Sequence, residues 1–513
     1  MSAPLGRDCR LAVYPAPGGL DSAGRLDRRP RVAIVGAGIA GLAAATGLAE
    51  RGAEVTMYER EEHLGGRVGG WPAWLPDGTG VTMSRGFHAF FRQYYNLRAL
   101  LSRTDPGFER LTPLEDYPLL DAGGRTDTFH GLPTTPLLNA LAFALRSPTF
   151  RLRDLLALDG RAALPLATVD VPGIYQRLDH VGAAAFLERI KFPEAARHLA
   201  FAVFSRSFFA DPRELSAAEL AVMFHLYFLG SSEGLLFDVP ADPFPQSLWT
   251  PLAEYLTARD VAIHLRTNVE NVDKSRGFFR VTAGAEEEFD AVVLACEVGG
   301  LQSLVEASPR LGTDAWRRKI TGLRAAPGFL VRRLWLDRAV AAGRPPFLGT
   351  GGIPPVDNIS VLDRYESEAR SWARKTGGSV VELHAYAATT TDVDALSKQM
   401  DEQLRGIYPE IATSRAVGEI TLWREDCPLF GIGSFVNRPT VTTTTPGLVL
   451  AGDGIRIDLP VALMERAAAT GWAAANTLLT SWGIAGHPLH SVPNRGRLAL
   501  LNHLVPWLEQ GRP

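Results

Sequence analysis

The clearest pattern of apolar positions begins at residue 31. Arg31–Val35 is a largely β-branched run that predicts a buried strand. An Ala-rich apolar run over residues 40–51 predicts a helix, which Gly52 ends, and Glu54–Tyr58 predicts a second strand. Residues 32–49 approach the length of a membrane-spanning helix, but the glycines within them favour a βαβ unit instead.

A glycine-rich turn joins the first strand to the helix, and its sequence matches the dinucleotide-binding fingerprint. Gly36 permits the tight turn, Gly38 lets the backbone approach a pyrophosphate, and Gly41 lets helix and strand pack closely. The start of the helix, including Ala40, then faces the phosphates. Glu59 ends the second strand and is placed to accept hydrogen bonds from ribose hydroxyls.

A second glycine pair follows at Gly65 and Gly66, with Arg67 beside it, and fits a longer ligand whose phosphates need another donor. In these motifs the chain resembles the flavoproteins of the amine oxidase and carotenoid desaturase superfamily. The resemblance implies FAD, with Gly65, Gly66 and Arg67 along its pyrophosphate. We expect the FAD to be non-covalent, because Cys427-Pro428 lacks the neighbours typical of a covalent flavin attachment.

Two later segments extend this resemblance. Residues 261–296 look like the superfamily's internal adenine-binding stretch, with Val269 at the adenine position. Residues 447–453 predict a buried strand that ends in Gly452 and Asp453, which the resemblance places at the ribityl chain.

A helix is predicted after this strand. Pro460 suits its first turn, and the apolar pattern continues over residues 461–478. Its free N–H groups, around Met464, are expected to face the pyrimidine edge of the flavin, where reduction places negative charge.

The fold class predicted is α/β, with a discontinuous Rossmann-type FAD-binding domain and an α+β substrate domain built from two insertions. The expected segments are a flexible tail over residues 1–30, the FAD domain over 31–90, 255–300 and 445–490, the substrate domain over 91–254 and 301–444, and a C-terminal tail over 491–513.

The two insertions differ in pattern. The first predicts apolar helices over Leu132–Arg146, Ala184–Ile190, Ala195–Phe209 and Ala217–Leu229. The second predicts a helix over Thr391–Ile407 and strands over Gly328–Leu336, Asn358–Leu362, Val380–Tyr386 and Glu419–Trp423. The first insertion is also rich in aromatic residues (Phe201, Phe204, Phe208, Phe209, Phe224, Tyr227 and Phe228). They indicate either an ordinary core or a tunnel for a long apolar substrate.

Leu137–Leu145, followed by Arg146, Arg151 and Arg153, is either a buried helix or an interfacial helix with arginines at the lipid headgroups. The second reading predicts a membrane surface as a partner.

Composition excludes several classes of protein. Of 513 residues, 46% are hydrophobic and 21% charged, with a net charge of −3, which is typical of a folded chain and gives a nucleic-acid role no support. Three cysteines far apart form neither a disulfide framework nor a zinc site. The first thirty residues contain no apolar stretch typical of a signal peptide, so we expect a cytoplasmic protein, peripheral on the inner face of the membrane.

A closer resemblance covers residues 31–480 and includes the insertions. The segments that carry it are Met83–Asn96, Phe204–Ala210, Gly230–Gly234 and Gly452–Pro460. In these segments the chain resembles the actinobacterial carotene desaturase/methyltransferases of the isorenieratene synthase family. The resemblance implies that β-ionone rings of β-carotene become aromatic while one methyl group moves from C1 to C2. Such a methyl shift is intramolecular, so no methyl donor is required, and the chain carries one dinucleotide fingerprint.

This chemistry requires a base, and three residues are candidates. Asp458 lies just past the Gly-Asp motif, but an aspartate there is also typical of a helix cap. Glu465 falls inside the expected helix, where it either acts on substrate or pairs with an arginine. His88 follows a segment expected to return towards the flavin. Arg85, nearby, either contacts the flavin or pairs with an acid.

Other activities remain open at this stage. A linear-chain carotenoid desaturase or isomerase and a flavin amine oxidase are the alternatives, although residues 320–340 lack the lysine that amine oxidases commonly keep near the flavin. A flavin- or carotenoid-binding carrier without redox turnover is a further alternative. For the enzyme, a quinone or another acceptor is expected to reoxidise the flavin, and the sequence leaves the ring isomer undetermined.

Overall fold

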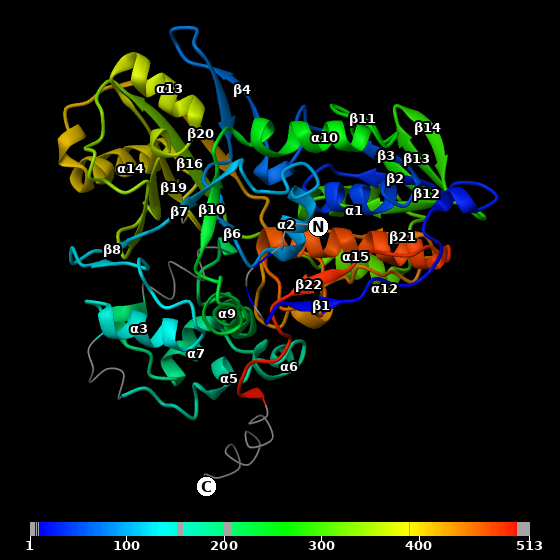
Figure 1. The fold of residues 1–513 in the computed structure, drawn as a ribbon, viewed down its shortest axis with the longest axis horizontal. Helices are drawn as coiled ribbons and strands as arrows, with labels where there is room; N and C mark the ends of the chain where they lie inside the picture. Colours follow the sequence, from blue (N-terminus) through cyan, green and yellow to red (C-terminus); the bar gives the residue numbers. More distant parts are fainter. Residues whose placement is uncertain are drawn as a thin grey trace.

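A five-stranded parallel sheet lies at the centre of the nucleotide-binding half of the molecule (Figure 1). The computed structural model describes residues 6, 8, 10–150, 157–197, 208–388 and 390–499. The strand order is β11 (Ala262–His264), β3 (Glu54–Tyr58), β2 (Arg31–Val35), β15 (Ala291–Leu294) and β21 (Leu448–Leu450). Since these strands come from three separate stretches of sequence, the predicted discontinuous Rossmann-type fold is confirmed.

Helices α1 (Ile39–Ala49) and α15 (Leu463–Ser481) pack against each other beside this sheet (Figure 1). Their contact is made by small residues. A Cβ atom on Gly471 would lie 2.3 Å from the carbonyl oxygen of Ala40, and one on Gly47 would lie 2.8 Å from the Cβ of Ala475. The Ala- and Gly-rich composition of α1 therefore serves close helix packing, and the helix is buried along its whole length.

Helix α15 begins later than its proline suggests. Ala462 is the extended N-cap and Leu463 the first helical residue, whereas Pro460 lies in the preceding loop. Leu463 has a φ of +53°, a left-handed backbone that a leucine adopts only where its surroundings enforce it. Leu463, the strained residue, therefore lies at the end of α15 that faces the cavity described below.

Further elements complete this half of the molecule. An antiparallel sheet contains β12 (Asn271–Lys274), β13 (Phe279–Ala283) and β14 (Ala285–Phe289), and a hairpin contains β4 (Gly70–Trp74) and β5 (Gly80–Ser84). The helices are α2 (Tyr95–Leu101), α10 (Thr250–Thr257), α11 (Val298–Ala307) and α12 (Asp314–Thr321).

A second sheet of seven strands forms the substrate half. Its order is β20 (Ala416–Arg424), β16 (Phe329–Leu336), β19 (Ser379–Ala385), β18 (Asn358–Val361), β17 (Phe347–Gly351), β8 (Leu119–Asp121) and β9 (Thr126–Asp127). The helices beside it are α13 (Ser367–Thr376) and α14 (Val393–Ile407) (Figure 1). Strands β6 (Phe90–Phe91), β10 (Phe237–Pro240) and β7 (Leu111–Leu114) form a small sheet between the two halves.

The first insertion also forms a helical lobe, in the lower part of Figure 1. Its elements are α3 (Leu138–Arg146), α5 (Leu164–Ala167), α6 (Gly173–Leu178), α7 (Ala183–Arg189), α9 (Ala217–Phe224) and a π-helical turn, η6 (His225–Leu229). The helix expected over Ala195–Phe209 lies mostly outside the described residues, as do Arg151, Arg153, Phe201 and Phe204.

The described parts of the two terminal segments, residues 10–30 and 491–499, are tied to the rest of the fold, where flexible tails are expected. Strand β1 (Ala12–Tyr14) pairs antiparallel with β22 (Leu489–Ser491), and Ala23 is fully buried. Arg28 forms an ion pair with Asp290, beside the first strand of the parallel sheet. The polar, Pro- and Gly-rich composition of residues 1–30 predicts a tail. The observed contacts join residues far apart in the sequence, so no short stretch of sequence indicates them. Within the described ranges, none of the helices has the length and apolar character needed to cross a bilayer.

A buried carboxylate connects the two halves. Glu219 on α9 is fully buried and lies 2.9 Å from Arg466 on α15 and 2.7 Å from Arg438, which precedes β21. Burial alone raises the pKa of a carboxyl group, but the two guanidinium groups outweigh it, and the pKa of Glu219 is lowered.

We expect Glu219→Gln to lower the free energy of unfolding by about 3–5 kcal/mol, because the change leaves two buried arginines without their counter-charge. The midpoint of urea unfolding measures this. As a control, Glu286→Gln, which removes an exposed partner of Arg280, is expected to change stability by less than about 1 kcal/mol. Because the folded-state pKa of Glu219 is lowered, its stabilisation is present above the unfolded-state pKa and is lost as the pH falls. Equal midpoints for the two variants would contradict this role.

Candidate active site

One continuous cavity of about 400 Å³ runs from the parallel sheet into the substrate half. Every residue predicted to bind the cofactor lines it except Gly41. A Cβ atom on Gly41 would lie 2.0 Å from the carbonyl oxygen of Gly36, so Gly41 allows close packing of helix and strand. The structure thus gathers motifs that are more than 400 residues apart into one site.

The two glycine segments contact each other directly. The backbone N–H of Gly65 donates to the carbonyl oxygen of Ala37 at 2.9 Å, and Gly38 and Gly65 form a β-bridge. Gly36 has a φ of +101°, and a Cβ atom there would lie 2.6 Å from the carbonyl oxygen of Ala295. These positions therefore require glycine both for backbone conformation and for close approach.

Glu59 holds the glycine turn as well as lining the cavity. Its carboxylate accepts from the N–H of Ala37 at 2.7 Å and from the N–H of Glu61 at 2.9 Å. Val269 lies in the same cavity. A carboxylate at the end of β3 and an apolar side chain nearby suit the ribose and the adenine of a dinucleotide.

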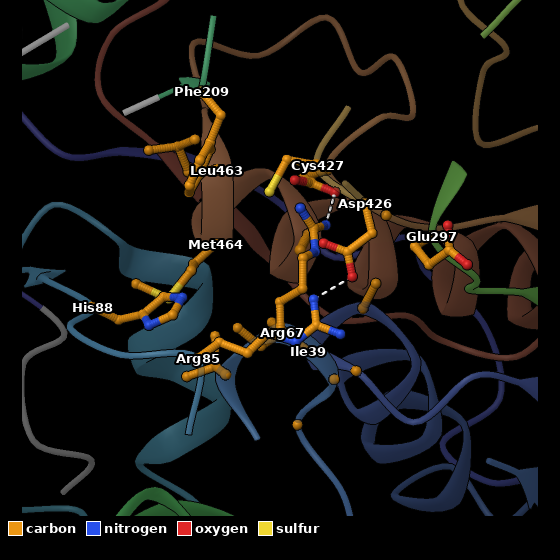
Figure 2. Close-up of a pocket in the computed structure, with 18 of the residues that line it drawn as sticks. Ile39, Arg67, Arg85, His88, Phe209, Glu297, Asp426, Cys427, Leu463 and Met464 are labelled. Atoms are coloured by element: carbon orange, nitrogen blue, oxygen red, sulfur yellow. Dashed lines mark hydrogen bonds and ion pairs between the residues drawn. The ribbon is translucent and has the colours of Figure 1, made fainter. Parts of the chain in front are cut away.

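Two arginine–aspartate pairs lie at the middle of the cavity (Figure 2). Arg67 pairs with Asp453 at 2.5 Å, and Arg85 pairs with Asp426. The neighbouring carboxylates outweigh burial and raise the pKa of Arg67 well above its usual value. Arg85 thus pairs with an acid, the second of the two roles predicted for it. The glycine cradle, the start of α15 and these cations form a donor set that fits the phosphates and polar chain of FAD.

The three candidate bases have different surroundings. His88 lines the cavity beside Met464 (Figure 2). Its Nδ1 donates to the carbonyl oxygen of Gly86 at 2.9 Å, which leaves the lone pair on Nε2. Burial lowers the pKa of His88 to about 4, so the ring is neutral at neutral pH. Among the three candidates, His88 is the one that the structure brings to the cavity.

Asp458 does not line the cavity: its side chain is about half exposed and accepts from Arg456 Nε at 3.1 Å. Since the loop before α15 carries it outward, the expected position beside the flavin is wrong.

Glu465 also lies away from the cavity lining. Its carboxyl group accepts from the backbone N–H groups of Asn96 and Leu97, both at 2.9 Å, at the start of α2. Burial raises the pKa of Glu465 to about 8, while these donors oppose the rise. Its position is that of a structural anchor for α2, which is neither of the two roles predicted for it, contact with substrate or pairing with an arginine.

Beyond the arginines the cavity is lined mainly by aromatic residues, with Asp357, Asn358 and His384 also in the lining. Aromatic residues from both insertions and from the segment after β5 form this chamber; they are Phe87, Phe91, Tyr94, Tyr117, Phe209, Tyr227, Phe237, Phe329 and Phe347. Their rings lie in mutual contact, for example Phe87 and Phe347 with centroids 4.3 Å apart. Of the aromatic residues singled out in the sequence, Phe209 and Tyr227 line the chamber, whereas Phe208 packs on Phe430 in the core; that the chamber holds a long apolar substrate stays a prediction.

A polar network on β19 and just beyond it was missed from the sequence. Glu382, His384 and Tyr386 alternate with apolar residues and so share one face of the strand. His384 lies 2.9 Å from Glu382 and 2.5 Å from the Tyr386 hydroxyl. The alternation is visible in the sequence, but the prediction for this segment is a strand alone and assigns no role to its polar side chains.

Comparisons with known proteins agree with this geometry. The model of the family described as flavin containing amine oxidoreductase matches residues 39–479. A carotenoid phi-ring synthase of Streptomyces griseus is 56% identical over 503 residues, covering 98% of this chain and 97% of that protein. A carotenoid phi-ring synthase of Chlorobaculum tepidum is 24% identical over 599 residues, covering 93% and 92%. Putrescine oxidase bound to putrescine has a TM-score of 0.63 at 15% identity, covering 88% of this chain and 99% of the other, which shows a shared fold.

We expect Gly38→Val to abolish cofactor binding without unfolding the protein. Gly38 has a φ of −73°, and a Cβ atom there would meet a single atom, Gly66 Cα, at 3.9 Å. The fold therefore tolerates a side chain at this position, but valine methyl groups occupy the space between the glycine segments. Flavin absorbance of the purified protein and its thermal unfolding measure the two effects. Gly343→Val, at a position with no atoms near its Cβ, is the control. Normal flavin content in Gly38→Val would contradict the assignment.

Proposed function

Since the chain belongs to the flavin containing amine oxidoreductase family and is an FAD-dependent oxidoreductase, we propose that it aromatises the β-ionone rings of a carotenoid. The proposed reaction converts β-carotene to a product of the isorenieratene type, with an intramolecular 1,2-methyl shift. The names of the two phi-ring synthases favour the phi isomer of the aromatic ring.

The observation that carries the proposal is the extent of the similarity to the Streptomyces griseus protein. At 98% of this chain, it includes both insertions, which form the aromatic chamber. Motifs for the cofactor alone are common to the whole family and do not distinguish substrates. An apolar chamber that continues from the cofactor cleft suits a long hydrocarbon better than a charged amine.

The residues of the chamber suit a reaction through carbocations. FAD, when bound, supplies the acceptor for the hydrides that leave the ring. The aromatic side chains exclude water, which would otherwise capture a cation, and their ring faces stabilise positive charge. His88 Nε2 is positioned to accept one of the protons that the ring loses, because it is neutral and carries its lone pair in the cavity.

Access to the chamber is proposed to be from a membrane surface. Helix α3 exposes Leu138, Leu141 and Leu145, each by 52–62%, on one face. Its buried Phe143 stacks on Phe129, which stacks on the cavity residue Tyr117, with centroids 4.8 and 4.4 Å apart. A row of packed aromatic side chains thus connects the exposed face of α3 to the wall of the chamber. We propose a peripheral protein on the inner face of the membrane, where a quinone acts as electron acceptor.

The function is tested with the FAD-loaded protein, β-carotene in detergent and a quinone under anaerobic conditions. We expect a pigment that is four hydrogens lighter per reacted ring and has lost no methyl group, measured by chromatography and mass spectrometry. Loss of hydrogens from linear precursors alone would instead indicate a linear-chain desaturase. A flavin that stays oxidised with every carotenoid when the quinone is left out, together with unchanged pigment masses, would contradict a carotenoid substrate, and amines would then be tried.

Membrane association is tested separately. We expect Leu138, Leu141 and Leu145 replaced together by serine to reduce sedimentation with anionic vesicles at least about tenfold, because the apolar face that enters the lipid is removed. FAD content should stay unchanged. The control is Val417→Ser on β20, which is 46% exposed and belongs to an element in the upper half of Figure 1, whereas α3 lies in the lower half. Equal sedimentation of all forms would contradict the assigned face.

A further inference from the structure

A line of four polar side chains crosses the wall of the apolar chamber. Arg333 on β16 lies opposite Glu382 on β19, and the two form an ion pair at 2.7 Å with both side chains buried. His384 and Tyr386 continue the line into the cavity, which both residues line. The network therefore begins in the core of the sheet and ends where substrate is proposed to bind.

The charges fix the direction of the hydrogen bonds. Burial opposes ionisation of Glu382, but Arg333 and His384 outweigh it and lower its pKa to about 2. The carboxylate is therefore ionised and accepts from His384 Nε2–H at 2.9 Å. His384 Nδ1 then carries the lone pair and accepts from the Tyr386 hydroxyl at 2.5 Å. The tyrosine oxygen accepts in turn from Asn358 Nδ2 at 3.1 Å.

The proposed reaction releases two protons from each ring, one after each hydride. The protons leave different ring carbons, so a single fixed base is poorly placed for both. His88 is one acceptor. It lies across the Gly86–Phe87 backbone from the network, since the Phe87 N–H donates to Glu382 at 2.8 Å and the Gly86 carbonyl accepts from His88.

We propose that Tyr386 and His384 form a second proton acceptor, with Glu382 as the positioning residue behind them; this inference rests on the proposed function. The C–H bond beside the cation breaks, and its electron pair becomes the last double bond of the aromatic ring. The proton joins the Tyr386 oxygen while the hydroxyl proton moves to His384 Nδ1. The resulting imidazolium lies against the Glu382 carboxylate, and the hydride has gone to FAD.

The phenol of Tyr386 is a weak base, but it is strong enough to accept a proton from a carbocation. A C–H bond next to a carbocation is far more acidic than one in a neutral hydrocarbon. Formation of the aromatic ring makes loss of this proton more favourable still. The arrangement follows the general logic of a group activated by a histidine that a carboxylate orients.

The backbone is built around this network. Gly86 has a φ of +87°, and a Cβ atom there would lie 2.2 Å from His384 Nε2 and 2.7 Å from Glu382 Oε1. The segment that carries His88 thus packs directly on the Glu382–His384 pair. Asn358 lies opposite His384 in the sheet, and its buried side-chain oxygen has no hydrogen-bond partner within the part of the chain that the structure describes, which is costly unless a ligand uses it.

The test compares Tyr386→Phe, His384→Gln and the double variant with β-carotene. Flavin bleaching is followed anaerobically without an acceptor, and pigment formation is followed with a quinone present, because each ring gives up two hydrides and one flavin accepts only one at a time. We expect flavin bleaching to stay within about twofold of the unaltered protein, because hydride loss precedes the proton step. Formation of the aromatic pigment should fall at least about a hundredfold, with partly desaturated rings accumulating. The double variant should be no slower than the slower single variant, since the two residues act as one unit.

The matched control is Tyr408→Phe, which also removes one buried tyrosine hydroxyl. Tyr408 lies outside the cavity lining, and among the described residues its hydroxyl has no hydrogen-bond partner. We expect it to leave product and rates unchanged. Wild-type yields of aromatic pigment from Tyr386→Phe would overturn the second acceptor while leaving the proposed function intact. Unaltered protein that bleaches no flavin with β-carotene would overturn the proposed function and the inference with it. Thermal unfolding and FAD content separate both outcomes from misfolding.

Discussion

The buried carboxylate of Glu219 is the contact on which the arrangement of the cavity depends. It lies between Arg466 of α15 and Arg438 before β21, so one anion joins the helical lobe to the nucleotide-binding half. The first turn of α15 presents Leu463 and Met464 to the cavity, and the turn after α9 presents Tyr227. The ion triad therefore joins the elements that carry these lining residues on the two sides of the cavity.

Most of the nucleotide-binding half could be predicted because its signals are local. The fingerprint from Gly36 to Gly41 contains its own strand and helix, and the boundaries of β2, β3 and α1 fall within two residues of those expected. The role of Gly41 follows from its contact with Gly36 inside one βαβ unit. Gly36 also packs against Ala295, just after β15, and this long-range contact is consistent with the local requirement for glycine.

The site beyond the cofactor could be predicted only in part. Asp458 and Glu465 are candidates because they lie close to a cofactor motif in the sequence. The loop before α15 turns Asp458 away from the cavity, and Glu465, one position after Met464 on the helix, faces α2 instead. His88 reaches the cavity because the segment after β5 returns across both halves. The network of Glu382, His384 and Tyr386 depends on Arg333 in a neighbouring strand. The sequence of one strand does not show which residue of the next strand lies opposite it.

An apolar chamber with a few ionised groups behind its wall reconciles two opposing requirements. Carbocations persist only where water and strong nucleophiles are absent, which favours aromatic side chains. Proton loss nevertheless needs an acceptor, and an exposed carboxylate would attack the cation. Placing Glu382 behind His384 keeps the anion out of reach of the substrate, while its charge still stabilises the imidazolium that proton uptake creates. A buried arginine at the far end is then required, because the carboxylate would otherwise take up a proton itself and lose that function.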